Sequence, residues 1–400
     1  MRVEIFPARP DGSVAAPPSK SMAHRLLICA CLAEGGSEVR NVACSQDVLA
    51  TLDCLSALGA QIVREGDAVR VRGADPRLAS GALLPCRESG STLRFLAPLC
   101  LLSGAEKRLT GTEKLLSRPL SVYADLCRSQ GLRFLQDRSS LTLAGTLTPG
   151  EYRFPGNISS QFVSGLLFAL PLLPGDSRIV LEPPVESRSY IDMTRAALRA
   201  FGVRAEWTEE TVLSVPGGQR PVPQCVTVEG DWSNAAFFLA LGLPVTGLRE
   251  DSLQGDRVCV EYLRRLEAGA ATLDLSDCPD LGPVLMAAAA LRQGARFTGT
   301  GRLRLKESDR GAAMAEELGK FGVAVRISEN EITVGSGAHA PADVLDGHND
   351  HRIVMALSVL CCAVGGTITG AEAVRKSFPD FFTRLRAAGG KVEFPDGMDQ

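Results

Sequence analysis

The chain has 400 residues, of which 45% are hydrophobic, 22% charged and 5% aromatic, and its formal net charge at pH 7 is −3. A chain of this length is too long to form a single ordinary hydrophobic core, so about two domains are expected. The slightly negative net charge excludes a generally basic nucleic-acid-binding protein. No run of about 18 apolar residues occurs and Met1–Phe6 show no signal-peptide pattern, so we expect a cytoplasmic protein without a membrane span.

The cysteines and histidines do not have the spacing of metal ligands. The twelve cysteines are scattered, with Cys29-x-Cys31 and Cys361-Cys362 as the only close sets. The four histidines have no zinc-site spacing either. We therefore expect small core cysteines in a reducing compartment, with neither a metal nor a cofactor.

The first predicted helix follows Pro17-Pro18 and begins within Ser19-Lys20-Ser21-Met22-Ala23-His24-Arg25. Proline biases its predecessor towards extended backbone, and Ser19 or Ser21 is a suitable N-cap for the apolar run that follows. The free N–H groups of a helix start attract anions, and Lys20 and Arg25 add positive charge there. By itself, however, the motif is better explained by a serine cap with two solvated cations.

Similar helix starts recur along the chain, near Ser21, Ser91, Ser160, Ser233, Asp280 and His351. Each opens an apolar helix that we expect to be buried. A second series, an amphipathic helix that ends in glycine, places its glycines at residues 59, 131, 202, 269, 322 and 389. The two series run in step and share one short interval, so we predict six copies of one α/β unit. Three copies per domain place the domain boundary around residues 216–230, which are rich in proline and glycine.

Cationic phrases without a metal motif indicate the handling of multiply anionic small molecules. Ser117-Arg118, Ser187-Arg188, Lys306-Glu307-Ser308-Asp309-Arg310 and Arg375-Lys376 are examples. Lys306 and Arg310 stand four residues apart and are expected to face the same way on a helix.

Five motifs occur in order between residues 19 and 382: Ser-Lys-Ser-x-x-x-Arg, Ser-Ser-Gln-Phe, Lys-Glu-Ser-Asp-Arg, Asp-His-Arg and Lys-Ser-Phe-Pro-Asp. Together they closely resemble the 5-enolpyruvylshikimate-3-phosphate (EPSP) synthase family. The resemblance implies an α/β fold of two similar domains, each of three βαβαββ repeats in an inside-out barrel, with the active site in the cleft between them. The expected domains are residues 1–14 with 228–400, and residues 15–227.

The resemblance also implies the reaction, which is transfer of the carboxyvinyl group of phosphoenolpyruvate to the 5-hydroxyl of shikimate 3-phosphate through a tetrahedral intermediate, without a cofactor. The implied phosphoenolpyruvate contacts are Lys20, Gly90, Arg118, Gln161, Arg310, Arg352 and Lys376. The implied shikimate 3-phosphate contacts are Lys20, Ser21, Arg25, Ser159, Ser160, Gln161, Ser187, Tyr190, Asp280 and Lys306. Asp280, Glu307 and Lys20 are the implied catalytic residues. A monomer inhibited by glyphosate is expected.

Four positions depart from the family pattern. Pro18 replaces a glycine, His24 and Glu88 each replace an asparagine, and Arg302 aligns with an asparagine that contacts shikimate 3-phosphate. Two alternatives stay open at this point. One is the related UDP-N-acetylglucosamine enolpyruvyl transferase, which normally carries a loop cysteine where this chain has Ser117 and Arg118. The other is a catalytically silent anion-binding relative.

Overall fold

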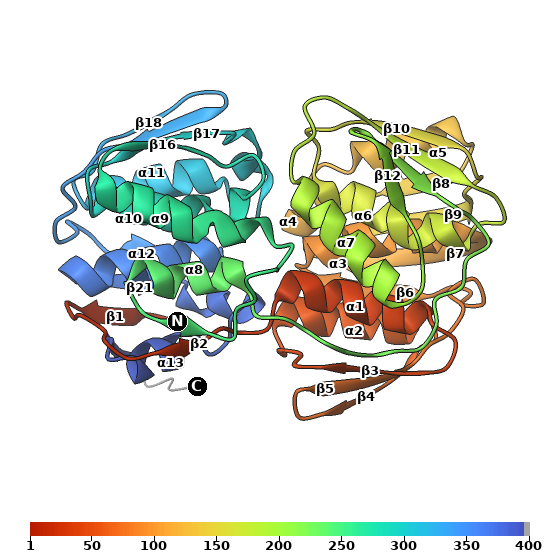
Figure 1. Ribbon diagram of the computed structural model, residues 1–400, viewed down its shortest axis with the longest axis horizontal. Helices are drawn as coiled ribbons and strands as arrows, with labels where there is room; N and C mark the ends of the chain where they lie inside the picture. The colour runs from red at the N-terminus through yellow and green to blue at the C-terminus, as the bar shows by residue number, and fades with distance from the viewer. Residues whose placement is uncertain (396–400) are drawn as a thin grey trace. The chain divides into compact units, whose positions relative to one another are not determined.

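A computed structural model describes residues 1–395 as two compact units (Figure 1). Unit 1 comprises residues 1–17 and 230–400, and unit 2 comprises residues 18–229. The chain passes from unit 1 to unit 2 after residue 17 and returns after residue 229. These boundaries lie three and two residues later than those of the expected domains. No helix within the described residues is long and apolar enough to cross a membrane.

Unit 2 contains three four-stranded sheets of one topology, in which a parallel pair is followed by two antiparallel strands. The first sheet has the order β14 (Cys225–Thr227), β3 (Gly36–Arg40), β5 (Ala68–Arg72) and β4 (Gln61–Glu65). The second has the order β6 (Leu83–Arg87), β7 (Leu102–Gly111), β9 (Ser140–Thr146) and β8 (Arg133–Gln136). The third has the order β10 (Glu151–Pro155), β11 (Ser177–Glu182), β13 (Val212–Val215) and β12 (Glu206–Glu209).

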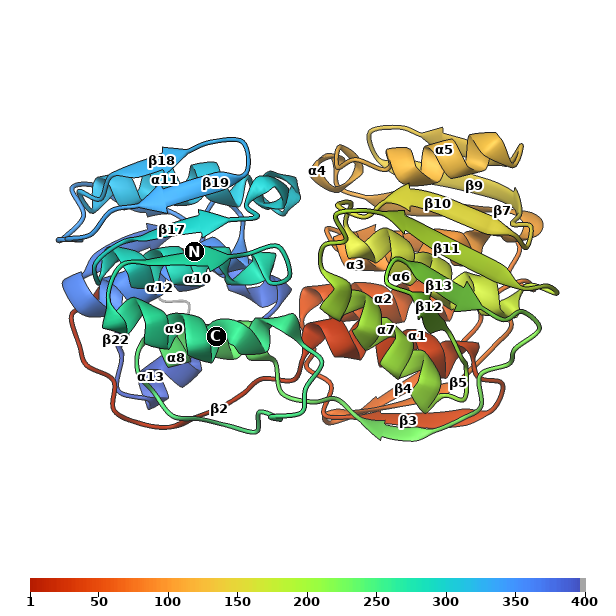
Figure 2. The same ribbon diagram turned by 45° about the horizontal axis from the view of Figure 1, so that its top comes forward.

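The helices of unit 2 are α1 (Lys20–Leu32), α2 (Gln46–Ala57), α3 (Gly90–Leu96), α4 (Glu113–Leu116), α5 (Ser121–Ser129), α6 (Ser160–Ala169) and α7 (Arg188–Ala200), with short 3-10 turns η1 (Pro98–Leu101) and η2 (Leu170–Leu172). Helices α3 and α6 lie between the sheets of this unit, and α5 and α7 lie nearer the outside (Figure 2). Nearly every residue of α3 and α6 is buried, whereas α7 buries one stripe. The expected division into inner and outer helices is therefore present in this unit.

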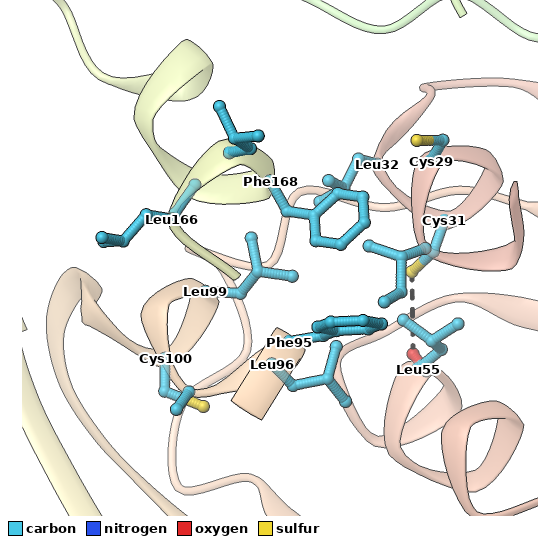
Figure 3. Close-up of a cluster of buried hydrophobic side chains, with 14 of the residues drawn as sticks. Cys29, Cys31, Leu32, Leu55, Phe95, Leu96, Leu99, Cys100, Leu166 and Phe168 are labelled. Carbon is cyan, nitrogen blue, oxygen red and sulfur yellow. Dashed lines mark hydrogen bonds between the residues drawn. The ribbon is translucent and has the colours of Figure 1, made fainter. Parts of the chain in front are cut away.

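The core of unit 2 is formed where α1, α2, α3 and α6 meet (Figure 3). Phe95 and Phe168 pack edge to face with ring centroids 5.6 Å apart. Cysteines fill the space around them, and Cys31 Sγ lies 4.0 Å from the Leu55 carbonyl oxygen. Ten of the twelve cysteines are buried and all are free, which is the expected role of small core residues.

Unit 1 contains two sheets of the same topology. One has the order β16 (Ala271–Asp274), β17 (Ala295–Thr298), β19 (Glu331–Val334) and β18 (Val325–Ile327). The other has the order β20 (Leu345–Asp346), β21 (Gly366–Thr369), β1 (Val3–Phe6) and β22 (Lys391–Glu393). The N-terminal strand β1 pairs with both β21 and β22, so the start of the chain completes the last repeat.

Six α-helices occur in the part of unit 1 that the structure describes. They are α8 (Trp232–Ala240), α9 (Cys259–Ala268), α10 (Gly282–Ala290), α11 (Arg310–Lys320), α12 (His351–Val364) and α13 (Phe381–Ala387). Short 3-10 turns connect them: η3 (Gly255–Val258), η4 (Pro279–Leu281), η5 (Gly301–Leu305) and η6 (Ala371–Lys376). All nine residues of α10 are buried, as expected for an inner helix.

The fourth of the six predicted copies of the α/β unit is reduced. Its sheet contains only the parallel pair of β15 (Val245–Thr246) and β2 (Val14–Ala15). After α9 the chain passes directly to β16, without the antiparallel hairpin that follows α2, α5, α7 and α11. The fourth interval of both sequence series is short because this hairpin is missing.

Candidate functional site

Helix α1 begins where the sequence predicts, and Ser19, not Ser21, is its N-cap. Ser19 accepts a hydrogen bond from the Met22 backbone N–H and so caps the helix. Lys20 Nζ lies 2.8 Å from Asp47 Oδ2 in the first turn of α2, and both side chains are largely buried. Sequence reasoning missed Asp47, because nothing in its local pattern distinguishes it from an ordinary first-turn acid.

Arg25 is buried among neutral oxygen atoms. Its Nε donates to Thr194 Oγ1 at 2.8 Å, and its two terminal nitrogens donate to the carbonyl oxygens of Ser21 and Tyr190 at 2.6 and 3.0 Å. No carboxylate within residues 1–395 pairs with it. Burial lowers the pKa of Arg25 to about 10, so it keeps its charge at neutral pH. A buried cation without a counter-ion is unfavourable in the protein alone and attracts an anion.

Two guanidinium groups face the backbone of Gly90, the first residue of α3. A Cβ atom added to Gly90 would lie 2.5 Å from a terminal nitrogen of Arg118 and 3.5 Å from one of Arg94. Ser89 caps the helix by accepting a hydrogen bond from the Thr92 N–H. Glycine at this position therefore lets positive charge approach a helix start, as an anion site requires.

Gln161 joins this loop to the start of α6. It accepts a hydrogen bond of 2.8 Å from Arg94 and donates one of 3.0 Å to Ser91 Oγ. Ser159 caps α6, and Ser160 is buried beside it. Sequence reasoning did not assign Arg94 to the site, and its hydrogen bond to Gln161 is what identifies it.

Ser187 and Tyr190 lie at the start of α7. Ser187 is buried with a left-handed backbone, φ 55°, and precedes the helix without capping it through its side chain. The carbonyl of Tyr190 accepts from Arg25. The starts of α1, α3, α6 and α7 in unit 2 therefore carry several cationic and hydroxyl side chains, and Asp47 pairs with Lys20 there.

In unit 1, the buried guanidinium of Arg310 is the centre of a second cluster. Its nitrogens donate to Asp350 Oδ2 and Asp280 Oδ1 at 2.8 Å, and to Glu307 Oε2 at 2.6 Å. These three carboxylates raise the pKa of Arg310 although burial acts to lower it. The cluster thus joins two of the implied catalytic residues, Asp280 and Glu307, through one arginine.

Three cations converge on Asp280. Lys306 Nζ lies 3.0 Å and Arg310 2.8 Å from Oδ1, and Arg352 lies 3.2 Å from Oδ2. Burial acts to raise the pKa of Asp280, but the charges of Arg352, Lys306 and Arg310 outweigh it and hold this pKa well below its ordinary value. Burial also lowers the pKa of Lys306 despite the nearby Asp280. The Asp280 carboxylate is therefore ionised at neutral pH.

The prediction that Lys306 and Arg310 share a helix face is wrong. Asp309 caps α11 by accepting from the Ala312 N–H, so the helix begins at Arg310 and Lys306 precedes it. Both side chains nevertheless reach Asp280. The pairing is produced by the loop between η5 and α11, not by helical spacing.

Asp350, Arg352 and Lys376 surround the start of α12. Asp350 caps α12 by accepting from the Arg352 N–H, and it also accepts from Ser308 Oγ. Lys376 Nζ donates to both the carbonyl oxygen and Oδ1 of Asn349 at 2.8 Å. Asp350, the acid of the Asp-His-Arg motif, was given no role from the sequence, and it connects Arg310 to the start of α12.

The structure shows the hydrogen-bond partners of two of the four residues that depart from the family pattern, His24 and Arg302. His24 is buried and its Nδ1 lies 2.7 Å from Thr51 Oγ1, which contacts Thr92 Oγ1 at the same distance. Burial, with Lys20 and Arg25 nearby, holds the pKa of His24 well below its ordinary value, so the ring is neutral. Arg302 donates a short hydrogen bond to the Ser276 carbonyl oxygen.

A possible metal group was found outside both clusters. Glu316, Glu317 and His348 bring ligand atoms within 4.8 Å of one another. Lys320 Nζ, however, donates to both oxygens of Glu317, at 2.9 and 3.0 Å. The lysine already supplies the positive charge that a metal ion would bring.

The fold is of the α/β class, and each unit has its own cluster of cationic side chains, which in unit 1 surrounds ionised carboxylates. The family model of EPSP synthase (3-phosphoshikimate 1-carboxyvinyltransferase) matches residues 6–272 and 260–385. Two curated 3-phosphoshikimate 1-carboxyvinyltransferases, from Clostridium kluyveri and Clostridium novyi, are 39% and 34% identical, each match covering 98% of both chains. That of Clostridioides difficile is 35% identical over the same shares.

The solved structure of the EPSP synthase from Acinetobacter baumannii has the same fold. Its TM-score is 0.78 at 24% identity, and the match covers 98% of this chain and all of that one. The chain therefore belongs to the EPSP synthase family of 3-phosphoshikimate 1-carboxyvinyltransferases (EC 2.5.1.19), transferases of the shikimate pathway to aromatic amino acids. This confirms the family expected from the motifs and disfavours the related UDP-N-acetylglucosamine enzyme.

Proposed function

We propose that the chain transfers the carboxyvinyl group of phosphoenolpyruvate to the 5-hydroxyl of shikimate 3-phosphate by addition and elimination. In the first step the hydroxyl oxygen bonds to C2 of phosphoenolpyruvate, a proton is added to C3, and the hydroxyl proton is removed. In the second step the C2–phosphate bond breaks and C3 loses a proton, which restores the double bond and releases phosphate. Family membership supports the overall reaction.

The buried, unneutralised charge of Arg25 is the observation that best supports binding of an anionic substrate in unit 2. We assign shikimate 3-phosphate to the helix starts around it. The proposed contacts there are Lys20, Ser21, Arg25, Ser159, Ser160, Gln161, Ser187 and Tyr190, with Asp280 and Lys306 contributed by unit 1. Phosphate and carboxylate groups supply the negative charge that Arg25 lacks in the protein alone.

Phosphoenolpyruvate carries a phosphate and a carboxylate, so its site needs several cations. We assign to it Lys20, Gly90, Arg118 and Gln161 of unit 2, and Arg310, Arg352 and Lys376 of unit 1. The close approach of Arg118 and Arg94 to Gly90 supports the unit 2 part of this assignment. Both units, which we propose are the family's two domains of three repeats each, thus supply contacts to the substrates.

Substrate binding is expected to strengthen Asp280 as a base. Arg310, Arg352 and Lys306 now hold its pKa well below the ordinary value. Phosphate and carboxylate groups of the substrates compete for the same cations, and each pairing lost by Asp280 raises its pKa towards that of an ordinary carboxylate. We propose that Asp280 accepts the 5-hydroxyl proton, that Glu307 serves at C3, and that Lys20 assists at the phosphate-bearing centre.

The activity is tested by following phosphate release with both substrates present. We expect release only when shikimate 3-phosphate and phosphoenolpyruvate are supplied together, with one 5-enolpyruvylshikimate 3-phosphate formed per phosphate. Reactions that lack either substrate are the controls, and UDP-N-acetylglucosamine is offered as a competing acceptor. Absence of release with a folded protein would indicate a catalytically silent relative.

Glyphosate inhibition follows from the same site. Because Gly90 has no side chain, space remains beside Arg118 for a small phosphonate with a carboxylate, and we expect glyphosate to compete with phosphoenolpyruvate. Full activity at high glyphosate would show that Glu88 or Ser89 has reshaped this space. The monomeric state and the cytoplasmic location stay predictions from the sequence.

A further inference from the structure

Glu317 is a buried carboxylate on α11 that the reaction scheme above does not use. Its side chain is fully buried, and it accepts hydrogen bonds from three different donors. Lys320 Nζ donates to both oxygens, the Asp346 N–H donates to Oε2 at 3.1 Å, and His348 Nε2 lies 3.0 Å from Oε1. Burying a carboxylate is costly unless such partners satisfy it, so this group is held in one place.

Two of those donors belong to the short segment 346–350, whose backbone is unusual. His348 and Asn349 follow one another with φ values of 49° and 51°. The left-handed region is unfavourable for residues other than glycine, and each such residue costs on the order of 1–3 kcal/mol unless its surroundings impose it. Glu317 holds this segment on one side by accepting from the Asp346 N–H and the His348 ring, and the His348 and Gly347 N–H groups donate to Asp346 Oδ1 and to the Thr369 carbonyl oxygen.

The same segment carries two anchors of the proposed site. Asn349 accepts two hydrogen bonds from Lys376 Nζ, through its carbonyl oxygen and its Oδ1. Asp350 pairs with Arg310 at 2.8 Å. The positions of Lys376 and Arg310 therefore depend on the backbone of residues 348–350.

Glu317 and Arg310 act on this segment from one helix. They stand seven residues apart on α11, which is two helical turns, so they project from the same face. Arg310 donates a hydrogen bond to Asp350, and Glu317 accepts hydrogen bonds from the Asp346 N–H and the His348 ring. Helix α11 therefore binds residues at both ends of the segment.

We propose that Glu317 and His348 are positioning residues for phosphoenolpyruvate binding, which fix the left-handed 346–350 segment and through it Lys376 and Arg310. The inference rests on the proposed function, because it takes Lys376 and Arg310 as contacts of phosphoenolpyruvate. Neither Glu317 nor His348 touches the reacting groups in this scheme. Their effect is expected on the KM for phosphoenolpyruvate and not on the KM for shikimate 3-phosphate.

The experiment compares steady-state kinetics of His348→Ala, His348→Gln and Glu317→Gln with the unaltered protein. Loss of a hydrogen bond to a buried charge predicts a KM for phosphoenolpyruvate raised about tenfold or more in His348→Ala and Glu317→Gln, with kcat within about threefold. His348→Gln should restore the original KM, because the glutamine amide N–H can occupy the place of Nε2–H. His339→Ala, which alters an exposed histidine of the same unit, should change neither constant.

Three outcomes would overturn the inference. One is a His348→Ala protein with unchanged KM for phosphoenolpyruvate, and another is an equal rise of KM for both substrates. The third is failure of His348→Gln to rescue, measured at a temperature where circular dichroism shows all variants folded. Lys376→Met serves as the reference: if it leaves the KM for phosphoenolpyruvate unchanged, the proposed substrate assignment has failed, and not the positioning role alone.

Discussion

At the scale of single residues, Asp280 has the surroundings that most clearly predict a kinetic effect. Its carboxylate is ionised because three cations surround it. We expect Asp280→Asn to lower kcat by about 10²–10⁴, the usual contribution of a general base, because an amide cannot accept the hydroxyl proton. Phosphate-release kinetics would measure the change.

The matched control is Asp343→Asn, which alters an exposed aspartate of the same unit that accepts only from its neighbour Val344. It should leave kcat unchanged. An Asp280→Asn protein with more than a tenth of the original kcat would refute the assignment of Asp280 as the base, whatever its KM values.

His24 gives a prediction for stability against pH. Its pKa in the folded protein is held well below the ordinary value near 6.5, mainly by burial. Below about pH 6.5 the unfolded chain therefore binds a proton that the folded chain does not. The free energy of unfolding should fall as the pH is lowered from 6.5, by up to about 1.4 kcal/mol per pH unit from this group.

His24→Asn should remove that contribution, since the asparagine amide can take the place of Nδ1 beside Thr51 without titrating. Urea unfolding of both proteins at several pH values between 5 and 7.5 gives the comparison. The difference between their free energies of unfolding should be constant above pH 6.5 and change below it. A difference that stays constant across the whole range would contradict the prediction.

At the scale of elements, the start of α3 shows how one missing Cβ determines the position of a cation. We expect Gly90→Ala to raise the KM for phosphoenolpyruvate about tenfold, because the new methyl would lie 2.5 Å from the Arg118 guanidinium and displace it. The thermal midpoint should hardly change, since the end of a flexible side chain can move aside.

Gly104→Ala in β7 is the control, because a Cβ there meets no atom within 4 Å. Its KM values should equal those of the unaltered protein. A Gly90→Ala protein with an unchanged KM for phosphoenolpyruvate would place Arg118 outside that substrate's site.

The elements also show where sequence spacing is informative and where it is not. Ser19 and the apolar run after it predict α1 correctly, because a cap and its helix are local in sequence. The four-residue spacing of Lys306 and Arg310 predicts a shared helix face that does not exist, because Asp309 starts the helix between them. The spacing of two residues in the sequence predicts a shared helix face only when both residues lie inside the same helix.

At the scale of the whole molecule, the N-terminal strand belongs to the unit formed mainly by the C-terminal half. β1 lies between β21 and β22, and Ile5 is buried against them. We expect Ile5→Ala to destabilise unit 1 by about 2–5 kcal/mol through lost burial and the cavity that it leaves. Hydrogen exchange should show faster exchange in β21 and β22, while β3 and β5 of unit 2 are unaffected.

Phe6→Ala, on the more exposed face of the same strand, should cost less than about 1 kcal/mol. If Ile5→Ala accelerates exchange equally in β3 and β5, the two units do not unfold separately and the assignment of the strand's effect to unit 1 is wrong.

The sequence by itself determined what is local or carried by motifs. The helix starts, the buried cysteines, the repeat of α/β units and the family all follow from residue types at short spacing. Only the tertiary structure decided the pairing of Lys20 with Asp47, of Arg310 with Asp350, and of Glu317 with His348. It also decided that the fourth repeat lacks a hairpin and that β1 completes the last sheet. These partners are separated by many residues, so the packing of helices and strands, and not the local pattern, brings their charges within bonding distance.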